Sequence, residues 1–592
     1  MEYPKLRMPS RSRQMIDTFL GYDHNLRISD GAFFDMKNLT SDHYPVLSPR
    51  GNRGIYAAVP DCTGMIAKDT LCYVSGSKFV IDGYEIEMNL TDEPKQLISM
   101  GAYVVILPDK KYINTEDHTD RGSIENEQIS KADVTFTLCR QDGTAYSLQH
   151  HGAQQPENPA DMDVWLDTSQ SQASLKQWSA SAEMWVSVTS TYIRIESAGI
   201  GVGFSQHDGV TISGLKDQQL LDENGEELHS AELEAIDGSF VVWQQGEDFL
   251  VITGLLSGQR KVRNQITVRR EMPKMDFVVE SGNRLWGCYY GPNEDKTKVI
   301  NEIYCCKLGD FKNWRCYMGI STDSWAASVG TDGKFTGAIT YQGYPLFFKE
   351  NVLHRVYISD TGAHQIRDTA CRGVEEGSWR SLAIVGEVLY YKSKRCICTY
   401  GGAMPQEVSQ ALGKQLYTDA AAGVYGSKYY VCMKDPDNIS QVFVLDTDRG
   451  LWHKEDAAQM EMFCACRGEL YFWDGADGQI KTISGAGDEE PGQVEWMAQT
   501  GLLGLSQPDM KYISRFVLRM WLPEGSQLSG YAQYDSSGRW EHLFTITGTG
   551  MKSFLLPVRP MRCDHMQLKL EGCGACRLYS ITKTIERGSD IS

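Results

Sequence analysis

The sequence predicts an all-β protein: a β-propeller of six or seven blades with an inserted β-sandwich-like domain and a C-terminal β-sandwich. Two observations indicate this fold. The 592 residues include 56 Gly, 29 Tyr, 19 Phe and 13 Trp, and the apolar runs are short and bounded by glycine, as strands and turns require. A unit of one turn and one strand also recurs along the chain. At this length we expect roughly three or four domains.

The first 60 residues are predicted to be an extended N-terminal arm. The arm carries four cations near its start, Lys5, Arg7, Arg11 and Arg13. We expect these cations to contact a neighbouring subunit or an adjacent ring, and a frayed terminus is the alternative. The segment lacks the apolar core of a signal peptide, and no stretch reaches the roughly 18 apolar residues of a membrane span. We therefore expect the protein to be made and kept in a cytoplasm.

The recurring unit is a glycine-containing turn followed by a strand rich in Leu, Tyr and Phe. Its seven copies have these residues at or near their starts: Leu71, Gly101, Gly282, Gly343, Gly386, Gly426 and Gly468. The last five copies are spaced by about 40 to 60 residues, the period of a four-stranded propeller blade. One blade cannot bury both of its faces, whereas blades stacked around an axis cover each other. We therefore predict blades over residues 61–130 and 271–484, and a succession of unrelated hairpins is the alternative.

Residues 131–270 interrupt the repeat and have a different character. Apolar and polar residues alternate with a period near two at 134–138 and again at 192–195. This pattern predicts an inserted β-sandwich or two small β modules. Beyond the repeat, the Gly- and acid-rich stretch 484–492 is typical of a linker. The short strand-like segments that follow the linker predict a β-sandwich over residues 493–592.

The chain is strongly acidic, with 77 Asp and Glu against 58 Lys and Arg, and a net charge of −19. Acidic surfaces do not attract phosphate backbones, so ordinary nucleic-acid binding is not expected. The same charge would repel a DNA duplex that slides past the protein. The 16 cysteines are far too few for a disulfide scaffold of this length, and we interpret them as free, buried thiols.

One group of residues has the types and the spacing of a zinc site. Cys563 and His565 precede a Cys-x-x-Cys pair, Cys573 and Cys576. The apolar alternation between the two pairs is that of a strand, however. We therefore predict buried or edge thiols at these positions, with no metal and no cofactor.

Two further cysteine pairs are expected to lie on single strand faces. Side chains alternate along a strand, so Cys396 and Cys398 share one face, as do Cys464 and Cys466. A metal bound between the two pairs would require their sheets to meet, and we do not expect it.

The sequence contains none of the common catalytic signatures. There is no phosphate-binding loop, no Gly-x-Ser-x-Gly elbow, no His-Glu-x-x-His pair and no dinucleotide fingerprint in a strand–helix context. Residues 446–452 and 535–540 share an Asp/Gly/Trp form that is similar to the Asp-box turn of sialidase propellers, and we interpret both as structural turns. We predict that the protein is not an enzyme, and a propeller hydrolase is the alternative.

Three tryptophans of the insertion, Trp165, Trp178 and Trp185, indicate a second candidate function. If their rings are exposed they could stack on sugars, as in a host-recognition or carbohydrate-binding protein. The alternative is that the three rings form the core of the inserted sandwich.

The N-terminal fifth of the chain resembles a known family. Residues 19–25, 36–42 and 45–51 have the layout of tailed-bacteriophage tail proteins of the packaged-DNA-stabilisation or tail-nozzle type. Those proteins open with an extended arm that ends in a string of the form P-x-L-x-x-R-x-G, and they continue into a β-propeller. Here the string reads PVLSPRG, one residue tighter before its glycine. Residues 443–453 and 562–565 are similar to proteins in prophages of Gram-positive bacteria.

This resemblance implies a structural virion protein of the phage neck or tail, assembled in the host cytoplasm. In that family the ring, often a hexamer, lies below the portal, closes the capsid exit and later conducts the genome. The implied partners are other copies of the chain, the portal or adaptor ring, distal tail proteins, and duplex DNA in transit without sequence-specific binding. The likeness covers the propeller in part and the insertion hardly at all, and it transfers no catalytic residue. Recognisable lumen-gating loops are lacking here, which leaves the plug role open.

Overall fold

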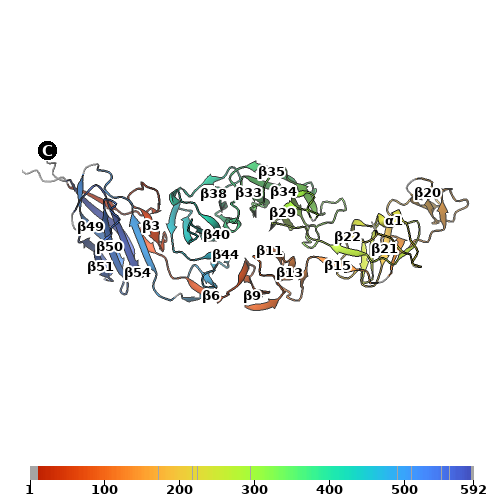
Figure 1. Ribbon diagram of the computed structural model, residues 1–592, viewed down its shortest axis with the longest axis horizontal. Helices are drawn as coiled ribbons and strands as arrows, with labels where there is room; N and C mark the ends of the chain where they lie inside the picture. Colours follow the sequence, from red (N-terminus) through yellow and green to blue (C-terminus); the bar gives the residue numbers. More distant parts are fainter. Residues whose placement is uncertain are drawn as a thin grey trace, which may run out of the picture.

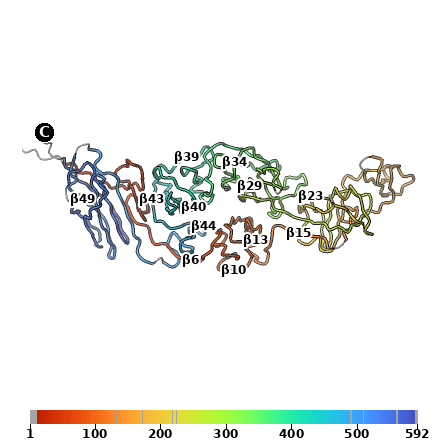
Figure 2. The backbone as a smooth tube through the Cα atoms, viewed as in Figure 1, coloured from red at the N-terminus to blue at the C-terminus, as the bar shows by residue number. Residues whose placement is uncertain are grey.

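The computed structural model describes residues 11–587, apart from residues 132, 171–172, 217, 223, 294, 490, 508–509, 549 and 559–560. Nearly all of the described elements are β-strands. Three parts lie in a row: a terminal sandwich at one end, a propeller in the middle and an inserted domain at the other end (Figure 1). Figure 2 shows that the red N-terminal trace and the blue C-terminal trace meet in the terminal sandwich and again at the rim of the propeller.

Seven antiparallel sheets of four or five strands form the propeller. The first two blades are β7 (Cys62–Ala67), β8 (Leu71–Ser75), β9 (Lys78–Ile81) and β10 (Tyr84–Glu87), then β11 (Gln96–Met100), β12 (Tyr103–Leu107), β13 (Lys111–Asn114) and β14 (Arg121–Ser123). The third and fourth are β28 (Phe277–Glu280), β29 (Leu285–Pro292), β30 (Val299–Cys305) and β31 (Trp325–Ser328), then β32 (Gly337–Tyr341), β33 (Tyr344–Lys349), β34 (Val352–Tyr357) and β35 (Gln365–Ala370). This arrangement confirms the predicted propeller.

The remaining three blades complete the ring. The fifth and sixth are β36 (Ala383–Val385), β37 (Val388–Lys392), β38 (Ile397–Tyr400) and β39 (Gln406–Glu407), then β40 (Thr418–Tyr425), β41 (Lys428–Lys434), β42 (Ser440–Asp446) and β43 (Leu451–Lys454). The seventh contains β44 (Met460–Cys466), β45 (Glu469–Asp474), β46 (Gln479–Thr482), β6 (Gly54–Ala58) and β47 (Asp488–Glu489). Two 3₁₀ turns, η1 (Trp379–Ser381) and η2 (Gln410–Leu412), flank the fifth blade.

The innermost strands of six blades, with the turn η1 before the fifth blade, contact one another in a closed circle. The order of contact is β7, β11, β28, β32, η1, β40, β44 and back to β7. Each blade thereby covers the apolar face of the next, which is the physical reason for closure. The last blade takes its fourth strand, β6, from the opposite end of the sequence, with Gly54 opposite Thr482.

The prediction of an extended arm over residues 1–60 is wrong for residue 11 onward. This segment forms β1 (Arg11–Ile16), β2 (Gly21–Tyr22), β3 (Ala32–Lys37), β4 (Leu39–Thr40), β5 (Ser48–Pro49) and then β6. β1 pairs with β55 (Arg577–Arg587) and β3 with β48 (Glu495–Thr500), so these strands complete sheets of the same chain. Pairing satisfies backbone groups that an arm would leave open.

The inserted domain lies between β14 and β28. One of its sheets contains β15 (Asn126–Ile129), β22 (Gly209–Ser213), β23 (Gly238–Val241) and β27 (Thr267–Arg270); the other contains β16 (Val134–Cys139), β21 (Tyr192–Glu196), β24 (Gln244–Gly246), β25 (Phe249–Thr253) and β26 (Arg260–Val262). The short helix α1 (Ala231–Glu234) accompanies them. Phe136, Ile195 and Leu250 are wholly buried in their shared core, which confirms the predicted sandwich.

A small sheet at the far tip of the molecule completes the insertion. It contains β17 (His150–Gly152), β18 (Val164–Asp167), β19 (Ser174–Ser179) and β20 (Met184–Ser187). Figure 1 places β20 at the end of the molecule opposite the terminal sandwich. We call this sheet the tip module.

The terminal sandwich combines both ends of the chain. Its first sheet has the order β1, β55, β49 (Lys511–Leu522) and β52 (Gly550–Leu556), with β53 (Arg562–Cys563) beside β49. The second has the order β2, β3, β48, β54 (Met566–Cys573), β50 (Gln527–Tyr534) and β51 (Glu541–Thr547). The predicted C-terminal sandwich is present, with three of its strands supplied from the N-terminal side.

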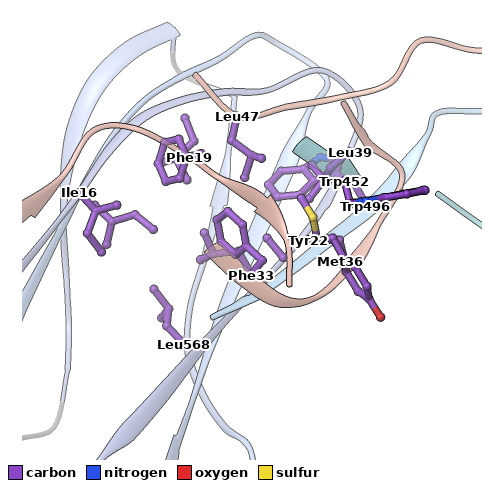
Figure 3. Close-up of a cluster of buried hydrophobic side chains, with 14 of the residues drawn as sticks. Ile16, Phe19, Tyr22, Phe33, Met36, Leu39, Leu47, Trp452, Trp496 and Leu568 are labelled. Carbon is purple, nitrogen blue, oxygen red and sulfur yellow. The ribbon is translucent and has the colours of Figure 1, made fainter. Parts of the chain in front are cut away.

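The core of the terminal sandwich is continuous with the sixth blade. Figure 3 shows Phe19 beside Leu47, Phe33 between Phe19 and Leu568, and Tyr22 and Met36 beside Trp452 and Trp496. The ring centroids of Tyr22 and Phe443 are 5.6 Å apart, which joins β2 to β42. The sandwich and the propeller therefore share one hydrophobic core. None of the helices in the described ranges is long and apolar enough to cross a membrane.

Candidate functional site

The outer face of the sheet β1–β55–β49–β52 is open to solvent and rich in arginine. Alternation along β49 turns Phe516, Leu518 and Met520 inward, where they are wholly buried. The intervening Arg515 and Arg519 point outward and are exposed. Beyond a register shift at Ile513–Arg515, buried apolar positions alternate with partly or fully exposed ones to the end of the strand.

Strand register places the cations side by side across this face. Arg13 of β1 and Arg515 of β49 both lie opposite Thr584, which separates them on the central strand β55. The next row contains Met15, Thr582, Val517 and Leu555, of which Met15 is 63% and Leu555 60% exposed. Residues opposite each other in a sheet are within side-chain reach. We call this surface the basic face.

The charge of the basic face is opposite to that of the whole chain. Among the described residues, this face carries the carboxylate of Glu586 and six arginines: Arg11, Arg13, Arg515, Arg519, Arg562 and Arg577. Glu586 forms an ion pair with Arg11 at 2.9 Å, and Arg577 lies over the Trp521 ring with its guanidinium carbon 5.2 Å from the ring centroid. In the described part of the chain, no ion pair or hydrogen bond engages the side chains of Arg13, Arg515 and Arg519.

The structure separates the four arm residues predicted from sequence. Lys5 and Arg7 lie outside the described residues. Arg11 and Arg13 belong to β1 and lie on the basic face, held by their own chain instead of on a free arm. Sequence reasoning missed Arg515 and Arg519, although their spacing of four along a strand of alternating apolar residues would have placed them on one face.

The zinc candidates are not assembled into one site. Cys563 and His565 precede β54, whereas Cys573 ends it, and eight residues of strand span about 25 Å. The His565 ring bonds to Ser536 and Asp564 at 2.7 and 3.0 Å. Burial raises the pKa of Cys576 to about 12, which disfavours the thiolate that a metal needs. Within the described ranges no three His, Cys, Asp or Glu side chains are placed to hold a metal.

The other cysteines are free thiols, as predicted. Burial raises the pKa of both Cys464 and Cys466 on β44. Cys396 and Cys398 differ, because their Sγ atoms are 3.6 Å apart and Arg372 Nη1 lies 3.3 Å from Cys396 Sγ. The expected shared face is present in this pair.

The three tryptophans of the insertion meet in the tip module. The Trp185 ring centroid lies 5.4 Å from that of Trp165 and 5.5 Å from that of Trp178, both in edge-on contact. Trp165 is buried, but it packs within the tip module, so the interpretation of these rings as the core of the inserted sandwich is wrong. Trp178 and Trp185 are only half-buried, and Met184 and Val186 beside them are exposed. The tip module therefore presents a partly open aromatic surface.

Residues of all seven blades, or of the turns that lead into them, line a cavity on the axis of the propeller. The cavity there has a volume of about 280 Å³, and Met65, Phe277, Trp379, Met462 and Phe463 are among the residues that line it. Pockets for single small molecules are typically about 300–1,000 Å³. A DNA duplex therefore cannot pass along the axis of one subunit.

No protein-family model matches the chain, and no curated protein matches it. Among solved structures it is similar to PorZ, a surface component of the type-IX secretion system of Porphyromonas gingivalis, with 10% identity over 88% of this chain and 77% of that chain and a TM-score of 0.26. It is also similar to BamB from Moraxella catarrhalis, with 11% identity over 36% of this chain and 72% of that chain and a TM-score of 0.21. An exo-β-1,3-galactanase from Phanerochaete chrysosporium shares 8% identity over 52% of this chain and 94% of that chain, with a TM-score of 0.21. Likenesses at this level carry no argument about activity or partners.

Proposed function

We propose that the chain is a structural protein of a tailed-phage neck or tail, which assembles with copies of itself into a ring below the portal. The ring, with a hexamer as the expected state, retains packaged DNA and conducts it on ejection. The basic face carries this proposal. A face with six arginines on a chain of net charge −19 is complementary to an acidic surface of another copy. A contact between two different surfaces of the same protein repeats around a closed ring.

The DNA path lies between subunits in this proposal. The axis of each propeller is too narrow for a duplex, so a channel must be enclosed by the assembled copies. Their acidic surfaces would repel the phosphate backbone and let the genome slide without sequence-specific binding. The N-terminal strings that resemble tail-nozzle proteins support the same assignment.

Negative-stain microscopy of the purified chain, alone and mixed with portal rings, tests this function. We expect rings, or a tapered tube docked at the portal. The variant Arg515→Glu with Arg519→Glu should remain monomeric under the same conditions. A matched control is Arg367→Glu with Arg539→Glu, which changes the net charge equally at exposed sites away from the basic face. A wild-type chain that stays monomeric at every concentration and ignores portal rings would contradict the proposal.

The tip module supports a second candidate function, that of a host-recognition or carbohydrate-binding tail protein. The observation that favours this function is the partly exposed ring of Trp185, which packs against Trp165 and Trp178 at the far end of the molecule. A glycan array probed with the wild type and with Trp185→Ala tests it, and Trp540→Ala in the terminal sandwich is the matched control. Binding that only Trp185→Ala abolishes would favour this function, and a blank array would exclude it.

A further inference from the structure

The cavity on the propeller axis contains a guanidinium without a partner. Arg380 belongs to η1, lines the cavity and lies over the ring of its neighbour Trp379, with the guanidinium carbon 4.9 Å from the ring centroid. No hydrogen bond or ion pair of its side chain is present in the described ranges. Arg380 is half-buried, and partial desolvation lowers the pKa of its guanidinium against the opposing influence of Glu461 and Cys62. A half-buried cation without a protein partner has lost part of its hydration, and an anion in the cavity would offset that cost.

The other polar side chains around the cavity already have partners. Lys95 Nζ lies 2.5 Å from Asp109 Oδ2 and donates to Thr91 Oγ1 at 2.6 Å. The Gln96 amide donates to the backbone oxygen of Asp276 at 2.7 Å, and its oxygen accepts from the Val278 amide at 3.1 Å. These hydrogen bonds hold Lys95 and Gln96 in place, so the guanidinium of Arg380 is the group in the cavity that could bind an anion.

The walls next to Arg380 are apolar and aromatic. The ring centroids of Phe277 and Trp379 are 6.1 Å apart, and Met65 and Phe463 also line the cavity. A guanidinium presents two parallel N–H donors that match a carboxylate. The volume of about 280 Å³ accommodates a small organic acid and no polymer.

The geometry points to a binding site on the propeller axis for a small organic carboxylate, with its carboxylate on Arg380 and its apolar body against Phe277 and Trp379. This site is independent of the ring assembly, because the basic face lies on the terminal sandwich. Residues of every blade, or of the turn that leads into it, line the cavity, so the bound acid would be enclosed by the ring of blades.

Isothermal titration calorimetry of the full chain with sodium benzoate tests the site, with inorganic phosphate as a second probe. We expect benzoate to bind, and to bind more tightly than phosphate, because only benzoate fills the apolar wall. Arg380→Met should weaken benzoate binding about tenfold or more, since charge-assisted hydrogen bonds contribute at least that factor. Arg380→Lys keeps the charge without the paired donors and should bind benzoate with an intermediate affinity.

Arg395→Met is the matched control, because Arg395 is an exposed arginine of the same blade and its loss should leave the affinity unchanged. Arg380→Met removes a charge that the fold leaves unpaired, so its unfolding midpoint without benzoate should equal or exceed that of the wild type. If this variant does not fold, the benzoate affinity of Arg380→Lys tests the proposal instead. Three results would overturn the proposal: no heat with millimolar benzoate, equal affinity in the Arg380 variants, or phosphate binding as tight as benzoate binding.

Discussion

Arg53 Nη2 lies 2.7 Å from Glu455 Oε2, and the two side chains are only 2% and 4% exposed. The same guanidinium donates to both carboxylate oxygens of Asp456, at 2.9 and 3.0 Å. Arg50 Nη2 approaches Asp456 Oδ2 at 2.9 Å. Arg53 directly precedes β6, the strand that closes the propeller, so this buried network attaches the closing strand to the segment that follows the sixth blade.

Arg53→Met should destabilise the propeller by about 3–5 kcal/mol, because the change leaves buried carboxylates without their cation. Urea unfolding followed by tryptophan fluorescence measures the effect. Arg11→Met is the control, since Arg11 pairs with Glu586 while 72% exposed, and loss of such a pair costs about 1 kcal/mol or less. Equal effects of the two changes would show that the buried network does not hold the closing strand.

The stability of the ring closure should fall in acid. Burial acts to raise the pKa of Asp456, but Arg53 and Arg50 outweigh it and lower that pKa from 3.8 to about 2. A lowered folded-state pKa adds stability above the unfolded value, and this contribution is lost between about pH 4 and pH 2. Acid titration of the unfolding free energy should lose about 2 kcal/mol in that window, and Arg53→Met should show a smaller loss. An unchanged acid profile in the variant would refute the assignment.

Assembly through the basic face should weaken as salt is added. Exposed charges interact over a Debye length of about 10 Å at 0.1 M salt and about 3 Å at 1 M. Sedimentation velocity across this range should show rings dissociating, with Arg13→Gln shifting the transition to lower salt because it removes one exposed cation of the face. Rings that are insensitive to salt would indicate an apolar interface elsewhere.

Gly21→Ala should disrupt the junction between the terminal sandwich and the sixth blade. Gly21 has a φ of +76°, and an added Cβ would lie 2.3 Å from the backbone oxygen of Trp452. Strain and overlap together should cost about 3 kcal/mol of unfolding free energy. The control Gly76→Ala, at a φ of +54° with nothing near its Cβ position, should cost about 1 kcal/mol. Thermal unfolding of both variants distinguishes the close approach from backbone strain alone.

Cys396 should react before Cys576, which is also buried. The hydrogen bond from Cys398 and the Arg372 guanidinium hold the pKa of Cys396 below its ordinary value, whereas burial raises that of Cys576 to about 12. Because the thiolate is the nucleophile, iodoacetamide near pH 7.5 should label Cys396 before Cys576, as peptide mass spectrometry would show. Arg372→Met should slow this labelling. Equal rates at Cys396 and Cys576 would contradict the assignment.

The parts of the fold that depend on local pairing were predictable from sequence, and the parts that depend on distant partners were not. Each blade is built from neighbouring hairpins, so the turn before Leu470 or Leu346 already indicates its strand. The partners of β1 and β6 lie more than 400 residues away, and no periodicity reveals such pairing. For the same reason the free guanidinium of Arg380 could not be found, because seven distant segments define its cavity.

The closing strand also determines the order in which the protein can form during synthesis. The pairing of β6 with β46 cannot occur until residue 482 has left the ribosome, and the pairing of β1 with β55 must wait until residue 586 has done so. The insertion is different, because β15 and β27 pair within residues 126–270 and complete their sheet while the ring is still open. A nascent chain would therefore carry a folded internal domain and an unfinished propeller, with an N-terminal segment that stays unpaired until β55 has been synthesised.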